Sequence, residues 1–360
     1  MDKINIQRVL IAPLDWGLGH ATRCIPIIKA FQLLHYEVII AADGSSAKLL
    51  TNEFPELRVV YLDGYHIQYA STAKGLPWKL FLQIPKILSS IKKEHQWLDT
   101  IIEKEKIDLI ISDNRYGLCT KKIPCVFITH QLLIKTPFKN LDRLIQKINY
   151  GYINRFTACW VPDASGENNI GGILSHPKLL PSIPVHYLGI LTRMKRNDET
   201  TMLFDYCFLL SGPEPQRSIL ENKILKSISK ISGSIIIVRG LPESDGFIEV
   251  PKNVQVFNHL PTNELSNIIS LSKLIICRSG YTSIMELIGL NKKAILIPTP
   301  GQTEQEYLAQ KLHTDHRFLY TNQVGLDLIQ AITLSKDYSF DKSDLPSFTT
   351  NELEKLILAI

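Results

Sequence analysis

Short runs of apolar, mostly β-branched residues recur along the first half of the chain, and longer segments of mixed polarity separate them. Continuous apolar runs of this length are typical of parallel strands that are buried on both faces. We expect strands at 9–12, 38–41, 59–61, 109–111 and 126–128, and helices at 20–35, 78–105 and 139–155. Strands that alternate with helices predict a doubly wound α/β domain.

The second half repeats this pattern, with expected strands at 206–210, 234–238, 254–256, 274–277 and 294–297. Between the halves, 193–200 is polar and lacks apolar periodicity, which favours a linker within 190–203. We therefore predict an α/β protein of two Rossmann-like, doubly wound domains facing a cleft. Their predicted ranges are 1–192 and 203–345, and 346–360 is expected to be a C-terminal helix that can pack on either domain.

Composition places the chain among globular proteins, since 45% of its 360 residues are hydrophobic and 21% are charged. The net charge of +5 is too small to indicate a nucleic-acid partner. The six cysteines form no C-x-x-C pair, so we expect buried, reduced thiols and neither disulfides nor a zinc site.

The first apolar run is interrupted by Pro13 and Asp15, so it reads as a strand and not as a signal peptide. No apolar run approaches the length that spans a membrane. We expect a cytoplasmic protein.

The loop after the first strand contains Gly17 and Gly19 and leads into a helix, where backbone N–H groups can meet a phosphate or an acceptor. A dinucleotide fingerprint would need Gly or Ala at position 22, but the chain has Thr22, which disfavours a nicotinamide cofactor. His20 falls in the first turn of that helix, where the dipole keeps imidazole neutral and able to act as a general base. Alternatively, His20 only caps its own loop.

Two further polar residues follow predicted strands directly, Asp113 after 109–111 and His130 after 126–128. A carboxylate at position 113 can accept the second N–H of the His20 ring and orient it, as a catalytic base requires. Asp113 is equally suited to cap a following helix, and contact with substrate is a third possibility. His130 is the second candidate for the base.

In the second half, 277–286 predicts a strand, a glycine turn and a helix, and Ser279 and Gly280 with the first helical amides form an anion cradle. Glu286 lies about two turns into that helix, where its carboxylate can accept from a ribose diol. Ser211 and Gly212 form a matching loop, and 298–305 is a polar loop suited to sugar hydroxyls or simply to solvent. No Asp-x-Asp occurs in the chain, so we expect no metal to hold a diphosphate.

Segments 17–20 and 277–280, together with Glu286 and Gln305, resemble the GT-B nucleotide-sugar glycosyltransferases, most closely the family 28 type. That family is typified by the N-acetylglucosaminyltransferase of peptidoglycan lipid-intermediate synthesis. The pair His20 and Asp113 is similar to the His–Asp dyad of the family 1 glycosyltransferases. The resemblance implies a UDP-sugar in the second domain as a co-substrate, no other cofactor, and N-acetylglucosamine as a candidate sugar. The donor residues that it implies are Ser211, Gly212, Phe257, His259, Leu260, Arg278, Ser279, Gly280, Thr282, Glu286, Glu304 and Gln305.

The resemblance also implies a metal-independent, inverting transfer, in which His20 deprotonates an acceptor hydroxyl while the helix that begins near Gly280 meets the diphosphate charge. Within that set, 257–260 is similar to the stretch whose backbone reads the base. Two other activities share this architecture or ligand: a non-hydrolysing UDP-sugar 2-epimerase, and a catalytically silent nucleotide-sugar-binding subunit.

Two segments, 74–86 and 135–147, interleave lysines with aliphatic and aromatic residues. This pattern suits a surface that lies on anionic lipid, and the acceptor would then be a lipid-linked or cell-envelope glycan at the inner face of the membrane. An ordinary amphipathic helix with its lysines in water explains the same pattern.

Overall fold

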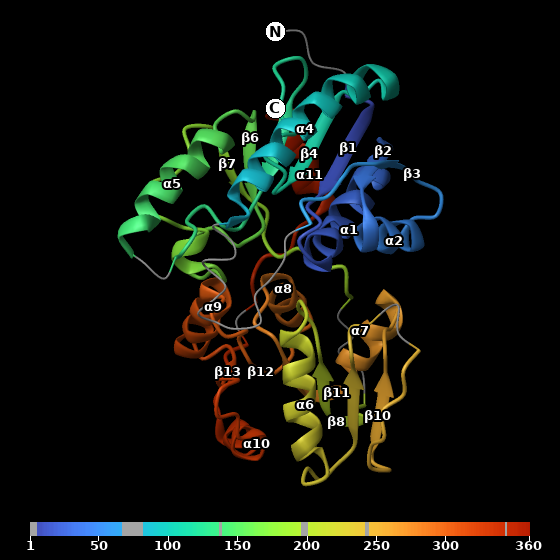
Figure 1. Cartoon of the computed structure of the whole chain (residues 1–360), viewed down its shortest axis with the longest axis vertical. Coiled ribbons are helices and arrows are strands. Elements are labelled where there is room, and N and C mark those ends of the chain that lie inside the picture. The colour runs from blue at the N-terminus through green and yellow to red at the C-terminus, as the bar shows by residue number, and fades with distance from the viewer. Residues whose placement is uncertain (1–5, 67–81, 137–138, 196–200, 242–244, 343) are drawn as a thin grey trace. The chain divides into compact units, whose positions relative to one another are not determined.

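The computed structural model describes residues 6–66, 82–136, 139–195, 201–241, 245–342 and 344–360 (Figure 1). The described residues form two compact units, one of 6–66, 82–193 and 346–360, and one that lies within 194–345. The division after residue 193 falls inside the segment where a linker is expected.

The first unit is built on a seven-stranded parallel sheet with the strand order β3-β2-β1-β4-β5-β6-β7. Its strands are β1 (Arg8–Pro13), β2 (Glu37–Ala42), β3 (Arg58–Tyr61), β4 (Leu109–Asp113), β5 (Cys125–Ile128), β6 (Ala158–Val161) and β7 (Val185–Tyr187). Its helices are α1 (Leu18–Leu33), α2 (Gly44–Glu53), α4 (Ile84–Glu105), α5 (Lys139–Ile153), α11 (Thr350–Leu358) and the short η1 (Gly172–Leu174). All five strands expected in this half are present, whereas β6 and β7 were not predicted.

The core of the first unit forms because alternate strand residues point to opposite faces of the sheet. Leu10, Ile110 and Phe127 are fully buried and pack in one cluster with Leu98 and Ile102 of α4. Helix α1 packs on β1 and β2 and also contacts α2 and α11. Both faces of the sheet are thus covered, which explains why its strands read as unbroken apolar runs.

The second unit contains a six-stranded parallel sheet with the order β10-β9-β8-β11-β12-β13. Its strands are β8 (Phe204–Leu209), β9 (Ile235–Val238), β10 (Val254–Phe257), β11 (Ser272–Cys277), β12 (Ala294–Leu296) and β13 (Leu319–Tyr320). Its helices are α6 (Gln216–Ile228), α7 (Thr262–Ser270), α8 (Tyr281–Gly289), α9 (Thr303–Thr314) and α10 (Leu328–Asp337). Residues from α6 and α10 pack with the strands in one buried cluster.

Both sheets have a topological switch point at the same place in the strand order. In each sheet the second and third strands are added on one side of the first strand, and the later strands are added on its other side. The switch lies between β1 and β4 in the first sheet and between β8 and β11 in the second. In open α/β sheets, ligands bind beyond the carboxyl ends of the strands at this point.

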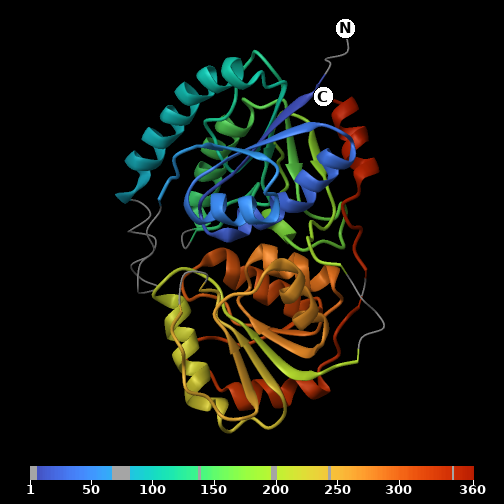
Figure 2. The same cartoon turned by 90° about the vertical axis from the view of Figure 1, so that its right-hand side faces the viewer.

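The last helix belongs to the first unit (Figure 2), which settles where 346–360 packs. Ile190 bridges Ser347 in parallel and donates its N–H to the Pro346 carbonyl at 2.8 Å. Gly189 has φ +76°, and a Cβ there would overlap the same carbonyl oxygen, so only glycine fits. Helix α11 then begins at a capping box between Thr349 and Glu352.

Candidate active site

The loop after β1 reaches the first switch point through a glycine that other residues cannot replace without strain. Gly17 has φ +82° and ψ 169°, and it precedes α1 without any side-chain cap. No acidic residue lies in the first turn of α1, so the positive end of the helix dipole there favours an anion or an acceptor group. Gly19 and His20 follow within that first turn.

His20 and Asp113 meet across this switch point. Nδ1 of His20 lies 3.0 Å from Oδ1 of Asp113, which is the last residue of β4 and is fully buried. The segment 114–120 contains no helix, so the alternative that Asp113 caps a following helix is wrong. The predicted contact is present, and the catalytic role of the pair stays a prediction.

Arg23 is the central residue of this cluster, and the sequence analysis missed it. Its buried guanidinium donates from Nε to Oδ2 of Asp113 at 2.6 Å and from Nη2 to Oδ1. It also lies 2.9 Å from Nδ1 of His20 and 3.0 Å, through Nη1, from Nδ1 of His130. The three titratable residues predicted in the first unit are therefore joined by one side chain. Its position three residues after His20 places it on the same face of α1, a spacing that the sequence does contain.

The charges in this cluster shift the pKa of both members of the pair. Burial raises the pKa of Asp113, but the opposing effects of the Arg23 guanidinium and of His20 are larger together, and the pKa falls well below its usual range. Burial lowers the pKa of His20; Asp113 raises it, while Arg23 and His130 lower it further, and the net effect is a lowered pKa. A neutral imidazole beside an ionised carboxylate is therefore the state at neutral pH, as a general base needs.

The loop after Asp113 is held by a second buried ion pair. Arg115 donates to Oε1 of Glu94 at 2.9 Å and, through Nε, to the carbonyl of Pro13 at 2.9 Å. The other oxygen of Glu94 accepts from the Tyr65 hydroxyl at 2.8 Å and from the N–H of Gly117 at 3.0 Å. These contacts join α4 to the ends of β1 and β4, and they fix the backbone that carries Asp113.

The second switch point is lined by the two predicted glycine turns. Ser211 and Gly212 follow β8, and Gly212 has φ +101° with open space where a Cβ would lie. Gly280 follows β11 and precedes α8, which has no side-chain cap and no acidic residue in its first turn. The positive end of the α8 dipole is therefore not offset by a side-chain carboxylate of its own first turn, which favours an anion there. The nearest atom to a Cβ on Gly280 would be Oγ of Ser283, 4.0 Å away.

Arg278 and Ser279 shape this turn through backbone contacts. The side chain of Arg278 is buried and donates to the carbonyls of Ile297, Pro298 and Gln216, at 3.2, 3.2 and 2.7 Å. Within the described parts of the chain no carboxylate pairs with Arg278, and burial lowers its pKa to about 10. The Ser279 hydroxyl donates to the carbonyl of Gln305 at 2.8 Å. This turn therefore holds a charged guanidinium without a neutralising partner.

The remaining predicted donor residues lie on α8, α9 and the loop after β10. Thr282 and the buried Glu286 lie on α8, and Glu304 lies in the first turn of α9. Gln305 also lies on α9, where its amide oxygen accepts from the N–H of Thr299 at 2.9 Å, so part of its bonding capacity is used inside the loop. None of these contacts tests a role in donor binding, and the roles stay predictions.

The segment with Phe257, His259 and Leu260 is fixed by a residue that the sequence analysis did not single out. Arg239, which follows β9, donates to Oδ1 of Asn258 at 2.8 Å and to Oε1 of Glu221 at 2.6 Å. The loop is thereby tied to α6 by a buried ion pair. His259 is exposed and Leu260 is buried.

Among the described residues, Asp43, Asp63 and His66 form a cluster whose side chains have metal-ligand atoms within 4.8 Å of one another. Nε2 of His66 lies 3.0 Å from Asp63 and 3.5 Å from Asp43, and the carboxylate of Asp15 accepts from the backbone N–H of His66 at 2.9 Å. Histidine and carboxylates can bind a metal ion, but these groups already pair with one another near the surface.

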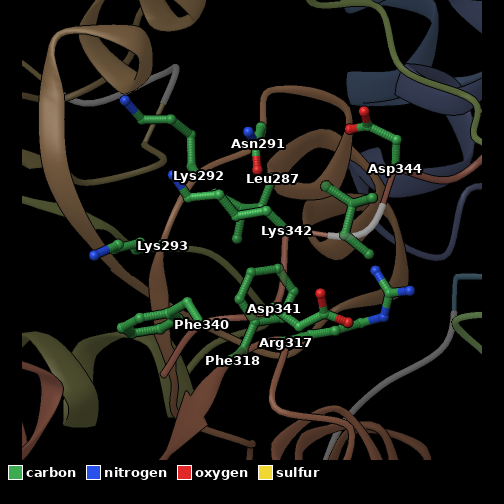
Figure 3. A pocket seen from close by; sticks show the side chains of 11 residues that line it. Leu287, Asn291, Lys292, Lys293, Arg317, Phe318, Phe340, Asp341, Lys342 and Asp344 are labelled. Atoms are coloured by element: carbon green, nitrogen blue, oxygen red, sulfur yellow. The ribbon is translucent and has the colours of Figure 1, made fainter. Parts of the chain in front are cut away.

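A separate hollow in the second unit lies away from the predicted donor residues (Figure 3). Lys293 and Phe318, which line it, directly precede β12 and β13, so it lies at the amino ends of these strands. Lys292 in its wall donates to the carbonyl of Ser270 at 2.7 Å. The donor residues follow the carboxyl ends instead, and the hollow is therefore a different feature.

Sequence comparison finds similarity to known glycosyltransferases. Residues 242–339 match the glycosyltransferase family 28 C-terminal domain. An uncharacterized glycosyltransferase of Methanosarcina mazei is 24% identical over 324 residues, which cover 83% of this chain and 82% of that protein.

Solved structures with the same fold include the glycosyltransferase of kitacinnamycin, at a TM-score of 0.66 and 12% identity, over 98% of this chain and 94% of that one. The glycosyltransferase VinC, solved in complex with dTDP, has a TM-score of 0.60 and 15% identity over 98% and 99%. The expected fold and family resemblance are confirmed. The chain is a glycosyltransferase with the GT-B fold, and residues 242–339 of its second unit match the family 28 C-terminal domain.

Proposed function

We propose that this glycosyltransferase transfers a sugar from a UDP-sugar to a hydroxyl acceptor, with inversion at the anomeric carbon and without a metal ion. The pairing of His20 with a buried, ionised Asp113 at the end of β4 is the observation that carries the proposal. VinC, a glycosyltransferase of the same fold, was solved with a nucleoside diphosphate, which supports a donor of that class.

In the proposed reaction, Nε2 of His20 takes the proton of the acceptor hydroxyl. The oxygen forms a bond to the anomeric carbon while the bond from that carbon to the diphosphate oxygen breaks, and UDP leaves with the electron pair. Asp113 stabilises the imidazolium that forms, since its carboxylate lies 3.0 Å from the other ring nitrogen. Attack on the face opposite the leaving group inverts the configuration.

The leaving diphosphate gains negative charge, and the second unit offers two compensating features. Helix α8 begins without a side-chain cap and without an acidic residue in its first turn, and Arg278, two residues before Gly280, has no carboxylate partner in the described chain. Fixed donors and charges of this kind stabilise a transition state without reorganisation. In this proposal, the α8 N-terminus and Arg278 stabilise the diphosphate charge, a function that a divalent cation has in other transferases.

Glu286 is proposed to accept hydrogen bonds from the ribose 2′- and 3′-hydroxyls, because it is buried one to two turns into α8. Glu304 and Gln305 are proposed to contact the sugar, Phe257, His259 and Leu260 the base, and Ser211, Gly212 and Thr282 the phosphates or the sugar.

The test is calorimetric titration of UDP and 2′-deoxy-UDP into the wild-type protein and into Glu286→Ala, with GDP and NAD as controls. The two uridine nucleotides differ only in one hydroxyl, so a carboxylate that binds the diol should make UDP bind about 10-fold more tightly. We expect Glu286→Ala to abolish this preference. Equal binding of both nucleotides to the wild type would remove Glu286 from the ribose, and absence of UDP binding would contradict the donor class.

The acceptor is proposed to be a lipid-linked glycan, reached by peripheral contact with anionic membrane. Helix α5 buries polar residues, among them Asn149, which accepts from the Tyr116 hydroxyl at 2.9 Å. Its outer face instead exposes Leu141, Leu144 and Ile148, at 43, 55 and 54%. Exposed Arg143 and Lys147 flank this apolar stripe. An outward apolar stripe with basic neighbours is complementary to an anionic lipid surface.

Leu141 and Leu144 of this α5 stripe lie in the second of the two segments singled out in the sequence, 135–147, and Ile148 follows it directly. Most of the first segment, 74–81, lies outside the described residues. No helix in the described part of the chain is long and apolar enough to cross a bilayer.

Flotation with vesicles that contain anionic phospholipid tests the membrane contact. We expect the wild-type protein to float and Leu144→Glu/Ile148→Glu to stay at the bottom, because two carboxylates then face the lipid. A control pair, Leu33→Glu/Leu334→Glu, changes exposed leucines on α1 and α10 and should leave flotation unchanged. Flotation that is indifferent to the α5 substitutions would exclude this face.

A further inference from the structure

Arg23 contacts three other members of the cluster at the first switch point: Asp113, His20 and His130. A guanidinium carries five N–H donors and no acceptor, and it stays protonated in proteins. A ring nitrogen that hydrogen-bonds to it must therefore offer a lone pair. This rule fixes where the proton lies on His130, whereas on His20 it acts against the carboxylate of Asp113.

For His130 the consequence is direct. Its Nδ1 lies 3.0 Å from Nη1 of Arg23, so Nδ1 is the acceptor of that bond. A neutral imidazole has one proton, which must then be on Nε2. The Nδ1 lone pair is held by Arg23, and Nε2 has no lone pair to receive a proton. His130 is thus a hydrogen-bond donor through Nε2 and unsuited to remove a proton from an acceptor.

For His20 the same arginine competes with a carboxylate. Nδ1 of His20 lies 3.0 Å from Oδ1 of Asp113 and 2.9 Å from Nη2 of Arg23. Asp113 favours a proton on Nδ1, which leaves the lone pair of Nε2 available. Arg23 favours a bare Nδ1, and its charge disfavours the imidazolium. Asp113 from β4, Arg23 on the same helix and His130 after β5 are the charged and titratable groups that act on this ring.

We infer that Arg23 is a positioning residue that gives the two histidines different parts: it holds His130 as an Nε2–H donor and leaves His20, oriented by Asp113, as the base. The inference deepens the proposed function, because the proton in question is that of the acceptor hydroxyl. His130 holds an oxygen of the substrate, and His20 takes the proton.

The first test needs no substrate. In protein labelled with ¹⁵N-histidine, long-range ¹H–¹⁵N spectra report which ring nitrogen carries the proton, and His20→Gln and His130→Gln assign the two rings. We expect His130 with its proton on Nε2 near pH 7.5, and loss of this single tautomer in Arg23→Lys, which keeps the charge but cannot span three partners. A wild-type His130 that carries its proton on Nδ1, or that holds both protons at this pH, would overturn the inference.

The second test compares amide variants during turnover of UDP-N-acetylglucosamine, with UDP release as the readout. Glutamine can place an N–H near the position of Nε2 but cannot take up a proton. His130→Ala should lose about 2–10-fold in activity, and His130→Gln should restore most of this loss. The acid limb should persist in His130→Gln and shift only slightly to higher pH, because His130 no longer lowers the pKa of His20. His20→Gln should be about 10²–10⁴-fold slower than wild type, like His20→Ala. If His130→Gln is as slow as His20→Gln and lacks the acid limb, His130 is the base and the inference fails.

The two tests separate this inference from the proposed function. If UDP-sugars are neither bound nor turned over, the donor assignment fails, and the tautomer of His130 in the substrate-free protein still decides the role of Arg23.

Discussion

His20 is the residue on which the pH dependence of the reaction should depend. Burial lowers its pKa below the ordinary 6.5, Asp113 offsets part of that effect, and the Arg23 and His130 contributions lower it further. At pH 6.5 and above, the base form therefore predominates. We expect kcat/KM to fall as the pH drops through a pKa below 6.5. A pH–rate profile checks this, and an acid limb centred above pH 6.5 would contradict it.

The same cluster shows what a single sequence reveals at this scale. His20 and Asp113 could be paired from the sequence because each follows a predicted strand, and the ends of adjacent parallel strands meet at one edge. Arg23 could not be assigned to this cluster from the sequence, because an arginine on a helix is usually solvated and the neighbouring residues do not indicate that it is buried. Its partner is 90 residues away in the chain.

At the scale of the element, a glycine-to-alanine substitution is expected to affect stability differently in the loop before α1 and in the loop before α8. Gly17 has φ +82°, a conformation that costs other residues about 1–3 kcal/mol. Gly280 has an ordinary φ of −71°, and there is open space where the methyl group of an alanine would lie.

We therefore expect Gly17→Ala to lower the free energy of unfolding by about 1–3 kcal/mol. Gly280→Ala should leave that free energy within about 0.5 kcal/mol of wild type and weaken UDP binding, because its methyl group lies where the diphosphate is proposed to approach. Urea denaturation and calorimetry measure the two quantities. Unchanged UDP affinity in Gly280→Ala would place the diphosphate elsewhere.

Ten strands were predicted from continuous apolar runs, and the three that were missed, β6, β7 and β13, were missed for separate reasons. The strand β13 has two residues, too few for any periodicity to appear, and β7 is only partly buried. The strand β6 is fully buried, but its sequence Ala-Cys-Trp-Val is followed at once by Pro162 and Asp163, and no helical pattern precedes β7. The alternation that identifies a Rossmann-like domain is absent there.

At the scale of the molecule, the last helix contributes to the stability of the first unit. Leu353 on α11 is fully buried, and α11 packs on α1. Leu353→Ala should lower the stability of that unit by about 2–5 kcal/mol, the cost of a buried cavity. Hydrogen exchange resolved by peptide should show faster exchange in 6–66 and 82–193, and unchanged exchange in 204–338.

Leu358, on the same helix, is 71% exposed and provides the control, since Leu358→Ala removes little buried surface. Loss of protection in both units of Leu353→Ala would mean that they unfold together. The sequence alone left the packing of 346–360 open, because an amphipathic helix shows which face it buries but not against what.

The packing of α11 on the first unit also affects the order in which the two units can fold during translation. A ribosome releases the chain from its N-terminus, and a domain generally folds as soon as it has fully emerged. Here the first unit includes residues 346–360, which emerge after the whole of the second unit. During translation the second unit can thus fold first, while the first waits with the apolar surface of α1 uncovered. We therefore expect cellular chaperones to bind the N-terminal half of the nascent chain.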